Sequence, residues 1–177
     1  MEYVDILDMD GNKIGVKSRE EASKDKDIYR IVYLWIITNK KILIQQRSFN
    51  KKSNPGLWDC AVAGHVLSGE NSVNAILREA KEELNLDLRE KELKLIYSNV
   101  DCDDKYQFHD VFIINKEIDV KKITIQKEEV ECFKLVTAKE LKDIIDSEFF
   151  AKDFHNLYVV NKIFKILKSK IRLHTSE

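Results

Sequence analysis

The sequence predicts an α+β fold, an α/β sandwich in which strands pack against a few helices. Runs rich in β-branched and aromatic residues recur along the chain, as at 29–38 and 107–115. Two other segments, 73–84 and 155–171, place apolar residues at helical spacing. The chain has 177 residues and no internal repeat, so we expect one domain over 1–177.

The composition is that of a globular protein with a net charge of −1, which does not indicate nucleic acid or a membrane as partner. We find no apolar run of transmembrane length and no basic and apolar leader of the signal-peptide type. Cys60, Cys102 and Cys132 are odd in number and lack metal-ligand spacing. We therefore expect reduced thiols and a cytoplasmic location.

The first part of the chain, 1–28, predicts a hairpin followed by a loop or short helix. The hairpin spans 3–17 and turns at Asp10-Gly11, where glycine suits the turn. The charged residues 18–27 favour the loop or short helix. Strands are then expected at 29–38, 41–46 and 58–63, with a polar loop over 47–56.

The core is expected to run from 29 to 147, and its second half again predicts strands. These strands are placed at 93–98, 107–115 and 130–136, with an acidic turn at 99–105 and a short strand or loop at 123–126. Thr137 is expected to cap a helix over 138–146. A linker over 148–152 then leads to a C-terminal helix over 155–171.

The stretch from Gly64 to Leu86 carries the functional information. Its first seven residues predict a loop, and Asn71 or Ser72 can cap the helix that follows. Glu79, Glu82 and Glu83 stand at i, i+3 and i+4, so they share a face away from the apolar stripe and repel one another. A solvated acidic face is the simpler interpretation. A hard divalent cation between these carboxylates and a phosphate would remove the repulsion.

The same stretch resembles the Nudix box, G-x5-E-x7-R-E-U-x-E-E-x-G-U, where U is a bulky aliphatic residue. The matching residues are Gly64, Glu70, Arg78, Glu79, Glu82, Glu83 and Leu86. Ala80 is a small version of the aliphatic residue, and Asn85 replaces the closing glycine at a helix C′ position that Asn tolerates. The resemblance implies a mixed sheet between helices and hydrolysis of a diphosphate bond in a nucleoside diphosphate derivative.

The resemblance also implies roles for single residues. Glu79, Glu82 and Glu83 would ligate Mg²⁺ or Mn²⁺ with help from the Gly64 carbonyl. Glu70 and Arg78 would pair with neighbouring carboxylates and hold the loop. A further carboxylate is expected from Glu129, with Glu128 as the alternative. Glu79, Glu82 and Glu129 are the catalytic candidates, one of which would orient the attacking water.

A small-molecule diphosphate is the expected partner, bound by a monomer or a homodimer. Arg47 and Lys51 lie where related enzymes hold the diphosphate, although a surface lysine can equally serve solubility. His65 can donate to a phosphate or pack within its loop. Trp35, Trp58 and Phe108 are interpreted mainly as core residues.

A wider series of motifs is similar to the Nudix branch of type 1 isopentenyl diphosphate isomerase. It consists of 35–36, 42–48, 55–59 and 63–66. That isomerase needs a cysteine just before the box glycine, where this chain has Ala63, and on a continuous strand Cys60 would face the opposite side. Asp110 matches a later glutamate of the isomerase. The sequence favours hydrolysis over isomerisation, and a non-catalytic nucleotide-binding module is a third hypothesis.

Overall fold

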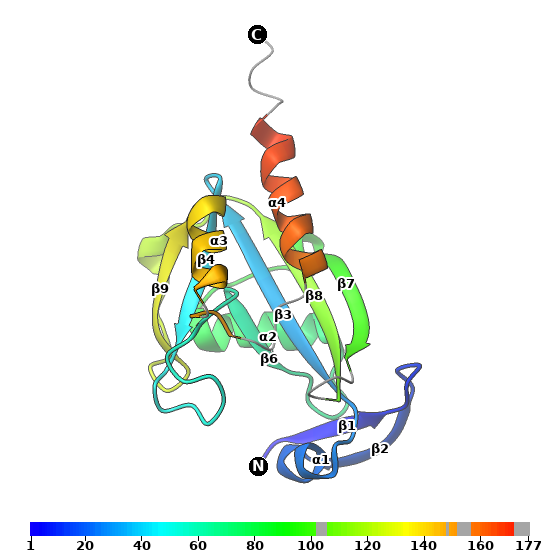
Figure 1. The fold of residues 1–177 in the computed structure, drawn as a ribbon. Coiled ribbons are helices and arrows are strands. Elements are labelled where there is room, and N and C mark those ends of the chain that lie inside the picture. The colour runs from blue at the N-terminus through cyan, green and yellow to red at the C-terminus, as the bar shows by residue number, and fades with distance from the viewer. Residues whose placement is uncertain (102–105, 148, 152–156, 172–177) are drawn as a thin grey trace.

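The computed structural model describes residues 1–101, 106–147, 149–151 and 157–171 (Figure 1). Cys102, Glu148 and His155, which the sequence places in a turn, a linker and a helix start, lie outside these residues. The strands are β1 (Tyr3–Leu7), β2 (Lys13–Ser18), β3 (Tyr29–Thr38), β4 (Lys41–Arg47), β5 (Trp58–Asp59), β6 (Val62–His65), β7 (Lys94–Asp101), β8 (Gln107–Asn115) and β9 (Val130–Val136). The helices are α1 (Arg19–Asp25), α2 (Ser72–Leu84), α3 (Ala138–Asp146) and α4 (Leu157–Ile171), with short 3₁₀ turns η1 (Glu90–Glu92) and η2 (Val120–Lys122).

A mixed sheet organises the described chain. β3 pairs in parallel with β8 and antiparallel with both β4 and β6, while β7 extends the sheet beyond β8. β5 and β9 both pair antiparallel with β4. Figure 1 shows α2 on one side of this sheet and α3 and α4 on the other. The predicted α+β sandwich is therefore confirmed.

The alternation of side chains along β3 creates the two faces of the core, because successive residues of a strand point to opposite sides. Odd-numbered residues from Ile31 to Ile37 join the cluster that contains Leu141 of α3 and Ile163 of α4. Even-numbered residues from Val32 to Ile36 join the cluster that contains Ile76 of α2. β3 is buried on both faces as a result.

The N-terminal hairpin and α1 lie at the end of the sheet where β3 begins (Figure 1). The Leu7 amide donates to the Ile28 carbonyl over 2.8 Å, and the Ser68 amide donates to the Tyr3 carbonyl over 2.8 Å. The second bond ties β1 to the loop after β6. This unit therefore borders the Gly64–Glu70 stretch, although it is distant from it in sequence.

Three element assignments were wrong. The segment 58–63 is not one strand, because it divides into β5 on β4 and β6 on β3. Gly64 and His65 belong to β6 and not to a loop, since Gly64 pairs with Val32 in the sheet and pairing overrides a loop-like composition. β7 continues to Asp101, beyond the predicted start of the acidic turn. The open choice at 123–126 resolves as a loop after η2.

The expectation for Cys60 was also wrong in its geometry. Because the chain breaks between β5 and β6, strand alternation does not separate Cys60 from Ala63, and both contact the cluster on the α3 and α4 side. The Cys60 thiol is fully buried and donates to the Val62 carbonyl over 3.1 Å. Burial raises the pKa of this thiol well above its usual range, with help from Asp59.

No helix within the described ranges is both long enough and apolar enough to cross a membrane.

Candidate active site

Helix α2 holds the acidic residues, and both of its ends are capped. The Asn71 side chain accepts from the Asn74 amide over 2.8 Å, which selects Asn71 over Ser72 as the cap. Asn85 adopts the left-handed conformation expected of it, with φ of 53°, and its amide donates to the Lys81 carbonyl. Ala75, Ile76, Ala80 and Leu84 are buried against the sheet.

Gly64 and Glu79 lie against each other. A Cβ atom at position 64 would stand 2.1 Å from the Glu79 carboxyl carbon, so only glycine leaves room for this carboxylate. Burial raises the pKa of Glu79 to about 7, although Arg78 opposes this, and the charges of Glu82 and Glu2 add to it. The Glu79 carboxylate is thus packed beside the Gly64 backbone.

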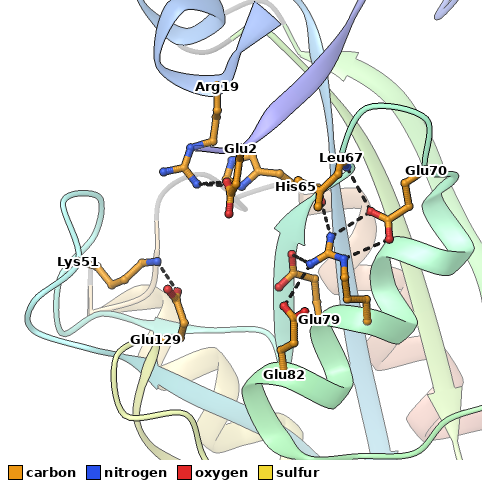
Figure 2. Close-up of polar contacts among 10 residues, drawn as sticks. Glu2, Arg19, Lys51, His65, Leu67, Glu70, Glu79, Glu82 and Glu129 are labelled. Carbon is orange, nitrogen blue, oxygen red and sulfur yellow. Dashed lines mark hydrogen bonds and ion pairs between the residues drawn. The ribbon is translucent and has the colours of Figure 1, made fainter. Parts of the chain in front are cut away.

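Arg78 connects the loop to the helix. Its Nε and Nη2 donate to the two oxygens of Glu70 over 3.1 and 3.0 Å, and Nη2 also donates to the His65 carbonyl over 3.0 Å. Nη1 donates to Glu79 over 2.8 Å and to Glu82 over 3.2 Å (Figure 2). Glu70 in turn accepts from the Leu67 amide. These contacts hold 65–70 against α2 through a planar, bidentate fork.

Glu83 does not share the exposed face expected for the three glutamates. Glu83 is only 5% exposed, and its carboxylate accepts a hydrogen bond of 3.1 Å from the Gln45 amide nitrogen. Burial raises the pKa of Glu83 well above its usual range, and Glu79, Glu129 and Asp59 raise it further. The amide oxygen of Gln45 is buried and has no hydrogen-bond partner among the described residues. Glu82, by contrast, has a half-exposed side chain.

Glu129 comes near this cluster through the backbone. The Gln126 amide donates to the Glu83 carbonyl over 3.0 Å, so the segment before β9 is tied to the end of α2. The Glu129 carboxylate pairs with Lys51, and the Ser48 amide donates to the Glu129 carbonyl (Figure 2). Glu128 is exposed. The geometry therefore favours Glu129 over Glu128.

Positive charges from three parts of the chain act on His65. Burial first, and then four nearby cations, together lower the pKa of His65 to about 3, so the ring is neutral at pH 7. The cations are Arg19, Lys51, Arg47 and Arg78. Such a group of cations beside carboxylates suits a ligand that carries both phosphate and a divalent metal.

Arg19 was missed in the sequence, because it lies far from the motif and its neighbours are ordinary charged residues. It begins α1, and its Nη1 lies 3.5 Å from His65 Nδ1 and 2.7 Å from a carboxylate oxygen of Glu2 (Figure 2). Only the capping box S-x-x-E at Ser18 signalled a helix start there. No local pattern could reveal the contact across to β6.

The guanidinium of Arg47, which the sequence predicts to bind the diphosphate, already contacts other groups of the protein. Its Nε and Nη2 donate to the Ser53 carbonyl over 3.2 and 3.1 Å, and its Nη1 lies 3.4 Å from a carboxylate oxygen of Asp59. These contacts brace the loop between β4 and β5, which carries Lys51. Within the described ranges, no three acidic, histidine or cysteine side chains converge on one metal position. Glu79 and Glu82 instead form ion pairs with Arg78.

The remaining candidates lie apart from this cluster. Trp35 is fully buried and stacks on Phe150, whereas Trp58 is partly buried beneath the Lys134 ammonium. Phe108 lies under the guanidinium of Arg30. Asp110 accepts from Arg30, Ser72 and Ser98, so its carboxylate is engaged in the sheet.

The chemistry of the donors fits a divalent cation, although the carboxylates do not converge on one position in the described residues. The donors are carboxylate and carbonyl oxygens, which Mg²⁺ and Mn²⁺ prefer. Glu83 is a buried carboxylate among other carboxylates, and the Gln45 side chain that donates to it is a neutral amide. Such a group is stabilised by a cation, because burial without compensation disfavours its charge.

A family model and several sequence relatives resemble the chain. The NUDIX domain model matches residues 28–157. Nudix hydrolase 3 of Arabidopsis thaliana is 33% identical over 98% of this chain, which spans only 24% of that protein. An uncharacterised Nudix hydrolase of Listeria monocytogenes is 31% identical, covering 98% of this chain and 99% of its own length. An isopentenyl-diphosphate Delta-isomerase of Citrobacter koseri is 30% identical over 49% of each chain.

The solved structure extends the likeness to the fold. A crystal structure of a Deinococcus radiodurans protein superposes with a TM-score of 0.72 at 21% identity, covering 89% of this chain and 97% of that one. The domain match covers more than half of the chain, and the Listeria relative matches it nearly end to end. This chain therefore belongs to the NUDIX domain family, with the names of its relatives pointing to the hydrolase class.

Proposed function

We propose that the chain is a metal-dependent hydrolase that cleaves the diphosphate bond of a nucleoside diphosphate derivative by attack of water on phosphorus. One observation carries this proposal: the α2 carboxylates Glu79 and Glu82 pair with Arg78, and Glu129, whose charge acts on the buried Glu83 of α2, pairs with Lys51, so carboxylates and cations alternate in one region (Figure 2). A diphosphate with its metal ion presents both charges that such a site needs.

Each residue then has a distinct task. Glu79, Glu82, Glu83 and the Gly64 carbonyl would hold the metal, which when bound neutralises phosphate charge and lowers the pKa of water. Lys51 and Arg19 would bind phosphate oxygens, and Arg47 would keep the loop of Lys51 in place. His65, being neutral, would donate one hydrogen bond. Glu129 would orient the water, and Arg78 with Glu70 would position the loop.

The test is release of monophosphate from a panel of nucleoside diphosphate derivatives with Mg²⁺ or Mn²⁺. We expect turnover that depends on the metal, and Glu82→Gln should lower kcat by at least about tenfold. Glu129→Gln should lower kcat as well, whereas the neighbouring exposed Glu128→Gln is the matched control and should not. Full activity of Glu82→Gln would contradict the metal site, and nucleotide binding without turnover would favour a binding module.

Isomerisation is the second candidate, supported by the partial match to an isopentenyl-diphosphate isomerase. Ala63 carries no thiol, and the Cys60 thiol is buried with a raised pKa, so neither supplies a ready proton donor. We expect no conversion of isopentenyl diphosphate to its allylic isomer. Conversion at a rate comparable to diphosphate cleavage would contradict the proposed hydrolysis.

A further inference from the structure

Glu2, the residue before β1, brings a carboxylate to Arg19, which lies beside His65. One of the Glu2 carboxylate oxygens accepts from Arg19 Nη1 over 2.7 Å. Figure 2 shows the Glu2 side chain extending toward the space between Lys51 with Glu129 and Glu79 with Glu82. Its charge is also close enough to contribute to the raised pKa of Glu79.

Backbone contacts determine this position of Glu2. The Arg19 amide donates to the Glu2 carbonyl over 2.9 Å, and Tyr3 pairs with Ser18 in the hairpin. The Ser68 amide then joins Tyr3 to the loop of the box over 2.8 Å. The side chains of Glu2 and Arg19 therefore lie next to each other on the hairpin unit, on the side that faces the candidate site (Figure 2).

The ion pair between the two side chains is easily exchanged. The Glu2 side chain is 50% exposed and that of Arg19 is 42% exposed, and a single guanidinium nitrogen makes the bond. Exposed pairs of this kind contribute little to stability. A phosphate group can engage the guanidinium through two oxygens, which is a stronger arrangement than one carboxylate oxygen.

We propose that Glu2 is a specificity-determining residue: in the free protein its carboxylate occupies the place on Arg19 that a phosphate group of the substrate takes in the complex. This inference rests on the proposed function of the site. A ligand must bring an anionic group to Arg19 in order to displace the Glu2 carboxylate. A ligand without such a group leaves Glu2 in place at the site, and the charge of Glu2 then weakens its binding. Glu2 acts through Arg19 and touches no reacting atom.

The experiment measures binding and not turnover. Methylenediphosphonate, a diphosphate analogue whose P–C–P link cannot be hydrolysed, is titrated calorimetrically into the full chain in Mg²⁺ buffer. We expect Glu2→Gln to bind it about two- to fivefold more tightly, since one exposed ionic contact no longer competes. Arg19→Gln should bind it about fivefold or more weakly. In the Arg19→Gln background, Glu2→Gln should change nothing.

The matched control removes one acidic charge elsewhere. Asp143 of α3 also forms an exposed pair, with Lys139 at 2.9 Å, and Asp143→Asn should leave the affinity unchanged. Unchanged or weaker binding by Glu2→Gln would overturn the inference, as would the same gain in both backgrounds, because Glu2 would then act only through its general field. These results leave the proposed function standing. Failure of the unaltered protein to bind the analogue also overturns the inference, whereas the proposed function falls only if no nucleoside diphosphate derivative is turned over.

Discussion

Glu83 is the residue at which stability and the proposed function are most opposed. Its pKa is raised above the ordinary 4.5, first by burial, so the folded protein retains this proton more strongly than the unfolded chain. Stability of the metal-free protein therefore falls as the pH rises through 4.5 and above. The buried acid is tolerable if a cation binds beside it.

Glu83→Gln should stabilise the metal-free protein at pH 8 by roughly 1–3 kcal/mol, because it removes a buried charge. The new amide keeps an oxygen for the Gln45 nitrogen and can donate to the buried Gln45 oxygen, which has no partner in the part of the chain that the structure describes. At pH 4 the difference should disappear. Urea unfolding at both pH values measures it, and a variant that is less stable than the unaltered protein at pH 8 would contradict the prediction.

Gly64→Ala tests the contact between the backbone of β6 and Glu79. The added Cβ would meet the end of a flexible side chain at 2.1 Å, so Glu79 must move while the fold survives. We expect Mn²⁺ affinity to fall by about tenfold or more, as for a displaced ligand. Electron paramagnetic resonance of free Mn²⁺ measures this.

The matched control for that variant is Gly15→Ala. Gly15 also lies in a strand, and a Cβ there meets only Ile6 at 3.8 Å, an ordinary contact. Its Mn²⁺ affinity should equal that of the unaltered protein. Equal affinity of both variants would show that Glu79 is not displaced or does not bind metal.

At the scale of elements, the ends of α2 explain how a departure from the box is tolerated. Asn85 adopts φ of 53°, a left-handed conformation that glycine adopts without strain. Asn85→Gly should therefore raise stability by about 0.5–1 kcal/mol and leave kcat unchanged. Thermal unfolding with parallel assays tests this, and a loss of stability would mean that the Asn side chain makes a contact of its own.

Regular elements could be predicted from the sequence, and pairing across the sheet could not. β8 and β9 have the bounds predicted from the sequence, and Thr137 caps α3 as expected. The break at 60–61 arises because β5 and β6 pair with different strands, which no local pattern encodes. For the same reason, the sequence predicted a loop at Gly64 and His65, which in fact pair with β3.

The candidate site shows the same division. The box motif identified Glu79, Glu83 and Arg78, since one helix spaces them. The sequence did not predict Glu2 and Arg19 as site residues, because they lie near His65 only through the folding of a hairpin that is distant in sequence. The partition between exposed Glu82 and buried Glu83 also depended on which strand packs against α2, and this is a tertiary property.

At the scale of the whole molecule, we propose that residues 1–177 form one cooperative unit. Both hydrophobic clusters share β3, so loss of either exposes the same central strand. Ile76→Ala in the α2 cluster and Ile163→Ala in the α4 cluster should each lower stability by about 2–5 kcal/mol. Calorimetry should show one transition in each variant. Two separated transitions would contradict the single unit.

The central claim is that the chain cleaves a diphosphate by attack of water on phosphorus. The most direct measurement is ³¹P nuclear magnetic resonance of a nucleoside diphosphate derivative incubated with the protein and Mn²⁺ in ¹⁸O-enriched water. We expect two phosphate-bearing products, one of which carries a single ¹⁸O on phosphorus, and no reaction when the metal is chelated. An uncleaved diphosphate across the whole substrate panel, or products without ¹⁸O on phosphorus, would contradict it.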